Sequence, residues 1–173
     1  MNTTIRDLTE RRSIRRYKAE QISKAELEEV LKAGVCAPTG MNRQSPIIVA
    51  VQKAETVKLL SKLNAEVMGS NNDPFYGAPT VLVVLADPEV RTYVHDGALV
   101  MGNLMNAAHA VGLGSCYIFR AKEVFETNEG KALLKKWGVP ENYVGIGNCI
   151  LGYPAEGGTR PVTPRKENYI IWA

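Results

Sequence analysis

Blocks of apolar and polar residues along the chain predict both helices and strands. Leu27, Val30, Leu31 and Val35 follow one another at helical spacing, and Ser23 with Glu26 has the pattern of a capping box before them. Residues 80–86 (TVLVVLA) are apolar without interruption, which is typical of a strand buried on both faces of a sheet. A long helix over 94–111 is predicted to run into a strand at 114–119.

Weaker patterns complete the set of expected elements. They predict helices at 4–11 (with Thr4 and Asp7 as its capping box), 55–63 and 124–137, strands at 47–51, 143–151 and 169–172, and loops at 37–46 and 69–79. Helices and strands are interspersed, with no repeat and no linker between them. The sequence therefore predicts a single α+β domain over residues 1–173, built on a central mixed β-sheet with helices on both faces.

The helix at 98–111 is too apolar for a surface helix in a chain of this size. Its apolar residues cover much of its circumference: Leu99, Val100, Met101, Leu104, Met105, Ala107, Ala108 and Val111. Such a helix needs burial on more than one side, and a sheet covers only one. The apolar tail at 169–172 would also invite aggregation if it were left as an exposed edge. We therefore expect a homodimer.

The charge distribution narrows the possible partners. The net charge is +3, and residues 1–24 alone hold seven basic and three acidic side chains, so the rest of the chain is nearly neutral. Nucleic-acid binding through this stretch stays a remote alternative, because only Tyr17 interleaves with the basic residues. Three scattered cysteines without a CxxC pair argue against a disulfide framework and a metal site. No signal peptide or membrane span is apparent, which favours a cytoplasmic protein.

Two segments carry side chains suited to a charged or heterocyclic ligand. In RRSIRRY (11–17), Arg11, Arg12 and Ser13 offer forked cationic donors and a hydroxyl, which suit a phosphate as well as a solvated basic turn. In APTGMNRQSP (37–46), Asn42 and Gln44 each present a donor and an acceptor. That pair suits a heterocycle with alternating carbonyl and N–H edges, or a loop that satisfies its own backbone.

Two further segments are weaker candidates. Gly112 and Gly114 stand between the predicted helix and strand in GLGSCY, where they permit close backbone approach to a ligand or form a helix cap and turn. The pattern is not the GxGxxG of a dinucleotide fold. Arg165 and Lys166 follow a GYP turn by about ten residues, and they either complete a phosphate site or are solvated.

Taken together, these segments resemble one known family. RRSIRRY, APTGMNRQSP, GLGSCYI, GYP and PRK occur in the order and spacing of the FMN-dependent nitroreductases, in their compact branch, over residues 6–166. The resemblance implies an interlocked homodimer with two FMN sites at the subunit interface. It also implies that the C-terminal segment, about 165–173, wraps onto the partner.

The resemblance also assigns roles to individual residues. It implies a grip on the FMN phosphate by Arg11, Ser13 and Arg165, with Arg12 and Lys166 as helpers. It places Arg15 by the flavin N1/C2=O edge, where a fixed cation stabilises reduced flavin. Partner-subunit contacts are implied for Pro38, Thr39, Asn42 and Gln44, and contacts near N5 for Gly114 and Ser115.

The implied reaction is ping-pong hydride transfer from NADH or NADPH through flavin N5 to a small-molecule oxidant such as a nitroaromatic or quinone. The cofactor carries the chemistry, so no side chain is needed as acid, base or nucleophile. Phe75 and Tyr76 are expected either to gate the substrate site or to plug the end of the sheet. Dehalogenation, substrate oxidation and flavin reduction are the alternatives within the same fold.

Overall fold

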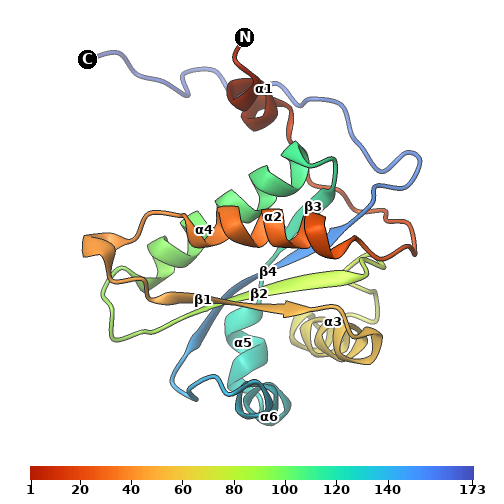
Figure 1. The fold of residues 1–173 in the computed structure, drawn as a ribbon, viewed down its shortest axis with the longest axis vertical. Coiled ribbons are helices and arrows are strands. Elements are labelled where there is room, and N and C mark those ends of the chain that lie inside the picture. Colours follow the sequence, from red (N-terminus) through yellow and green to blue (C-terminus); the bar gives the residue numbers. More distant parts are fainter.

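A four-stranded sheet forms the centre of the protein, and the computed structural model describes it together with all of residues 1–173 (Figure 1). The strands are β1 (Pro46–Val51), β2 (Thr80–Ala86), β3 (Gly114–Ile118) and β4 (Val144–Gly152), in the spatial order β1-β2-β4-β3. All three pairings are antiparallel. The α+β class is confirmed, but the expected mixture of parallel and antiparallel strands is wrong, because the sheet is antiparallel throughout. Parallel pairing is limited to an isolated bridge between Ser13 and Ser115.

Helices cover both faces of the sheet. They are α1 (Thr3–Glu10), α2 (Lys24–Val35), α3 (Ala54–Met68), α4 (Tyr93–Ala110), α5 (Ala121–Glu126) and α6 (Asn128–Trp137), with a short 3-10 turn, η1, at Gly40–Asn42. Figure 1 shows α2 and α4 on one face and α3, α5 and α6 on the other. Successive β2 residues point to opposite faces of the sheet. Leu82 and Val84 therefore belong to the core under α2 and α4, and Val81, Val83 and Leu85 belong to the core on the side of α3, α5 and α6.

Local sequence signals explain most element boundaries. Ser23 caps α2, and the reciprocal bond from the Ser23 backbone to Glu26 confirms the predicted capping box. In α1 the cap is Asn2, whose side chain accepts from the Thr4 N–H, so the predicted Thr4 box is wrong. The helix expected at 124–137 is two helices, because Thr127 leaves helical geometry and its hydroxyl caps α6 at Gly130.

The strand expected at 169–172 is absent, and the apolar helix expected at 98–111 is buried only in part. Residues 169–172 form no strand, and Trp172 is 91% exposed at the end of an extended tail. In α4, Val100, Met101, Leu104 and Ala108 are buried against the sheet and α2, whereas Leu99 stays 48% exposed. None of the helices is both long and apolar enough to cross a membrane.

Candidate functional site

The segment 11–18 is anchored between two strands that are distant in sequence. The Ile14 N–H donates to Ser115 O at the start of β3 (2.9 Å), and the Lys18 N–H donates to Tyr153 O just after β4 (2.9 Å). The Ile14 side chain is buried against Gly114, where an added Cβ would come within 2.9 Å of it. The structure therefore brings Arg11–Ser13 next to Gly114 and Ser115, two groups that the sequence placed in one site.

Arg11 and Arg12 hold guanidinium nitrogens that are buried and have no hydrogen-bond partner. Arg12 donates through Nη1 to Thr9 O (2.8 Å) and Arg11 O (2.6 Å), but its Nε and Nη2 are unpaired, as is Nη1 of Arg11. Buried donors of this kind are costly unless a partner satisfies them. A bound anion is the simplest partner, and a phosphate matches the fork geometry of arginine.

Nearby groups leave this positive charge uncompensated. Burial raises the pKa of the Cys149 thiol, although the positive charge of Arg11 opposes this in part. Burial likewise raises the pKa of Tyr17, whose hydroxyl donates to Ile14 O (2.7 Å). Both side chains are therefore neutral at physiological pH. Neither side chain therefore supplies a negative charge to Arg11 or Arg12.

A cavity of about 680 Å³ lies beside Arg15, the one predicted cofactor-binding residue that lines it. It is lined by Arg15, Met68, Ser70, Asn72, Asp73, Pro74, Tyr76, Cys116, Tyr117, Ile118, Phe119 and Arg120. The guanidinium carbon of Arg15 stands 6.0 Å from the centroid of the Tyr76 ring. Tyr76 is 41% exposed and faces this cavity, as a gating residue requires. Phe75 is only 1% exposed and belongs to the core, which favours the alternative of a plug at the end of the sheet over a gate for this residue.

A larger cavity, of about 780 Å³, lies between α3 and residues 70–79. Phe75 forms part of its wall, together with Lys58 and Lys62. None of the predicted cofactor-binding residues lines it. The smaller cavity is therefore the candidate site.

The loop at 38–44 lies away from the arginine turn in this chain. Asp96 of α4 fixes it by accepting from the Gly40 N–H (2.9 Å), and Gln44 donates through its side chain to Asn42 Oδ1 (3.1 Å). Figure 1 shows this loop at one end of α2 and residues 11–22 at the other. A helix of twelve residues is about 18 Å long, so one chain does not bring the two halves together.

The C-terminal basic residues are not brought to the arginine turn either. Arg165 and Lys166 are exposed on the tail, and the Lys166 ammonium lies 5.5 Å from the centroid of the Tyr169 ring. No hydrogen bond or ion pair joins them to residues 11–17. Their predicted part in a phosphate site stays a prediction.

Residues in the left-handed region cluster in the two parts of the candidate site. Side chains other than glycine have positive φ at Met41, Asn42, Gln44, Tyr76, Arg120 and Asn168. All but Asn168 lie in the 38–44 loop or line the smaller cavity. Such conformations cost about 1–3 kcal/mol each and concentrate at functional sites. The strain thus marks the same two segments as the sequence motifs do.

Two polar residues at the cavity, Asn64 and Arg120, belong to no sequence motif, and Arg120 lines the cavity itself. Asn64 of α3 is fully buried, donates to Phe119 O (2.8 Å) and accepts from Nε of Arg120 (3.1 Å). Its position four residues after Leu60, on the apolar face of a helix, is a signal of a buried polar contact. No local pattern around Arg120 marks that residue.

This arrangement is that of an α+β protein with buried, unpaired arginine nitrogens at residues 11 and 12, in the same segment as the cavity residue Arg15. The profile of the nitroreductase family matches residues 8–153, and the chain belongs to that family. A protein of Archaeoglobus fulgidus, provisionally named NADH dehydrogenase/NAD(P)H nitroreductase, is 33% identical over 162 residues, which cover 90% of this chain and 88% of the relative.

Two other similar proteins extend this result. A Bacillus subtilis protein named FMN reductase [NAD(P)H] is 24% identical over 190 residues, covering 96% of this chain and 72% of its own. A Bacteroides fragilis nitroreductase solved with bound FMN superposes with a TM-score of 0.92 and 28% identity, over the whole of both chains.

Proposed function

We propose that this chain is an FMN-dependent NAD(P)H oxidoreductase of the nitroreductase type that works as a homodimer. The observation that carries the proposal is the set of unpaired, buried guanidinium nitrogens on Arg11 and Arg12. They offer donors for a phosphate within the family's sequence motif, four and three residues before Arg15, which lines the cavity. The FMN bound in the similar Bacteroides fragilis structure supports the same assignment.

The residues of the chain fit the chemical groups of FMN. Arg11, Arg12 and Ser13 would hold the phosphate, and Arg15 would place a positive charge by the ring edge that gains electron density on reduction. Bound flavin supplies the hydride-transfer chemistry, so the protein's part is to bind, orient and shield the ring. Tyr76 and the cavity wall would position the second substrate.

A second copy would supply the missing half of the site. Asn42 and Gln44 are exposed, and they lie at the far end of α2 from Arg11 in the same chain. Helix α1 buries none of its residues, although Ile5 and Leu8 are apolar, and the tail leaves Ile170, Ile171 and Trp172 exposed. An isologous dimer would cover these surfaces and bring each loop to the other chain's arginine turn.

A visible spectrum of the purified protein tests the cofactor assignment. We expect flavin absorbance in the protein as isolated, or after incubation with FMN and removal of the excess. A protein that stays colourless would contradict the proposal. Stopped-flow mixing under anaerobic conditions with NADH, NADPH, nitroaromatics, quinones and free flavin then identifies the donor and the class of acceptor. Parallel double-reciprocal plots are expected for a ping-pong reaction.

A further inference from the structure

We propose that Arg120 is an anion-binding residue of the substrate cavity, and that the substrate it selects carries a carboxylate or phosphate group. The inference rests on the proposed function and names the chemical class of substrate for the same site. It differs from the phosphate grip of the cofactor, because Arg120 lines the cavity from the turn after β3, whereas residues 11–13 do not line it.

Arg120 adopts a backbone conformation that suits glycine better than arginine. Its φ is 73° at the turn between β3 and α5. For a residue with a Cβ, the left-handed region costs about 1–2 kcal/mol. Strain of this kind persists where the surrounding structure enforces it and where the side chain has a use. The position therefore carries an arginine at an energetic cost that glycine would avoid.

Asn64 holds the Arg120 side chain in place from behind. Its amide accepts from Arg120 Nε (3.1 Å) and donates to Phe119 O (2.8 Å). It therefore fixes both the backbone of the turn and the Nε end of the guanidinium. The two terminal nitrogens of Arg120 donate to no protein group, and Glu123, three residues further along, forms no ion pair with it. The outer fork of the guanidinium is therefore free to bind an anion.

The other charged groups of the cavity form no ion pair with Arg120. Asp73 is the acidic residue of the wall, and its carboxylate accepts from the N–H groups of Phe75 (2.8 Å) and Gly77 (2.7 Å) and from the Ser61 hydroxyl. Arg15 is assigned to the flavin edge in the proposed function. Arg120 is thus the cation left for the substrate.

Matched substrate pairs test this proposal. The acceptor pair is 4-nitrobenzoate and 4-nitrobenzamide, which share a shape and differ in charge, and the donor pair is NADPH and NADH, which differ by a phosphate. We expect the flavin-loaded wild-type protein to favour one anionic member. In Arg120→Gln, kcat/KM for that member falls about tenfold or more, and the value for its counterpart without that carboxylate or phosphate changes less than about twofold. Arg120→Lys restores part of the preference, because it keeps the charge.

The control is Lys131→Gln on the exposed face of α6, which removes one positive charge away from the cavity and should leave both ratios unchanged. Calorimetric titration of 4-nitrobenzoate and of NADPH, without turnover, gives a reading that does not depend on activity. If Arg120→Gln does not fold, the wild-type protein still tests the idea, because its anion preference must weaken as salt concentration rises.

Each outcome has a distinct meaning. A lost preference for nitrobenzoate identifies the anion as an acceptor carboxylate, and a lost preference for NADPH identifies it as the donor phosphate. Ratios that stay the same in Arg120→Gln, or a wild-type protein that does not discriminate, would overturn the proposal while leaving the oxidoreductase function intact. A wild-type protein that turns over no pair contradicts the proposed function instead, and the titrations then decide whether Arg120 binds an anion.

Discussion

At the scale of single residues, the chemistry depends on arginines in three different settings. Arg11 and Arg12 are half-buried with unpaired nitrogens, Arg15 is exposed at the cavity, and Arg120 is tied at its root by Asn64. Sequence alone treats the first three as one basic run. The structure separates them by burial and partners, and burial is what distinguishes a ligand-binding cation from a solvated one.

Arg15 is predicted to act on reduction of the flavin more than on its retention. Removing a fixed cation from the edge where negative charge develops should slow the step by about tenfold or more, while the phosphate grip keeps FMN bound. We expect Arg15→Ala to retain FMN within about threefold of wild-type affinity but to show slow anaerobic reduction by NAD(P)H. A variant that loses FMN and keeps its reduction rate would contradict this role.

Asn64 is predicted to be one of the more costly positions to truncate. Its side chain is fully buried and satisfies two groups of the β3–α5 turn, so Asn64→Ala leaves Phe119 O and Arg120 Nε without partners. We expect a loss of about 2–3 kcal/mol in the free energy of unfolding, measured by urea titration. Asn71→Ala, at an exposed position of the 69–79 connection, is the control and should change stability by less than about 0.5 kcal/mol.

At the scale of elements, apolar periodicity predicted the parts whose burial is decided locally. The strand at Thr80–Ala86 and the capping box of α2 are as expected, because an uninterrupted apolar run and a Ser–Glu pair each have one dominant structural use. The break at Thr127 was missed, because the apolar pattern continues across it while a single hydroxyl decides the boundary. The antiparallel pairing depends on tertiary contacts that no local pattern records.

In the candidate site, too, some residues could be predicted from the sequence and others could not. Arg11, Ser13, Gly114 and Ser115 were predicted from short motifs, and the fold does bring them together. Phe75 and Tyr76 are adjacent in sequence, yet one is buried in the core and the other faces the cavity. A change of backbone direction at Tyr76, where φ is 54°, separates them, and composition carries no sign of it.

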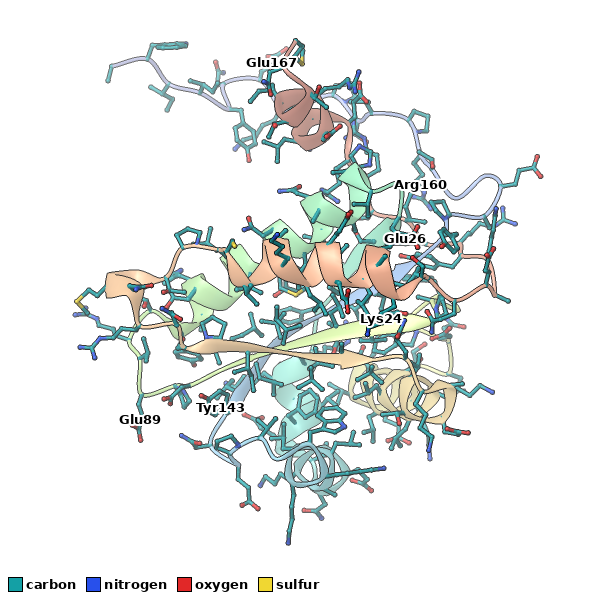
Figure 2. The ribbon with its side chains drawn as sticks, viewed as in Figure 1. Lys24, Glu26, Glu89, Tyr143, Arg160 and Glu167 are labelled. Atoms are coloured by element: carbon teal, nitrogen blue, oxygen red, sulfur yellow. The ribbon has the colours of Figure 1, made fainter.

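The start of α2 is predicted to respond to acid. Glu26 lies in the first turn of α2 (Figure 2). Hydrogen bonds from the Ser23 hydroxyl, the Tyr153 hydroxyl and the Ser23 N–H lower the pKa of Glu26 below its ordinary value. The unfolded chain therefore binds the proton more readily, so Glu26 adds stability above about pH 4.5 and loses it as the pH falls through the folded value. The difference in unfolding free energy between wild-type protein and Glu26→Gln should be largest near pH 7 and shrink towards pH 3.

At the scale of the whole molecule, a homodimer would account both for the exposed apolar surfaces and for the separation of the 38–44 loop from Arg11 and Arg12. A helix with no buried residue, a half-exposed Leu99 on α4 and an apolar tail are unfavourable in a lone chain. The 38–44 loop, with positive φ at Met41, Asn42 and Gln44, lies away from Arg11 and Arg12 of its own chain. Pairing two copies would bury the apolar surfaces and would place the 38–44 loop at the other chain's site.

Hybrid dimers test this arrangement directly. Arg11→Ala damages the phosphate side of a site, and the double variant Asn42→Ala with Gln44→Ala damages the loop side, so either homodimer should bind FMN poorly at both sites. In a hybrid of the two chains, one site collects all the damage and the other is intact. Hybrids isolated through two different tags should therefore bind about half the FMN of wild-type dimers. A hybrid that binds no better than its parents would show that each chain builds its site alone. A homodimer of the loop variant that binds FMN like the wild-type protein would show that the loop takes no part in the site.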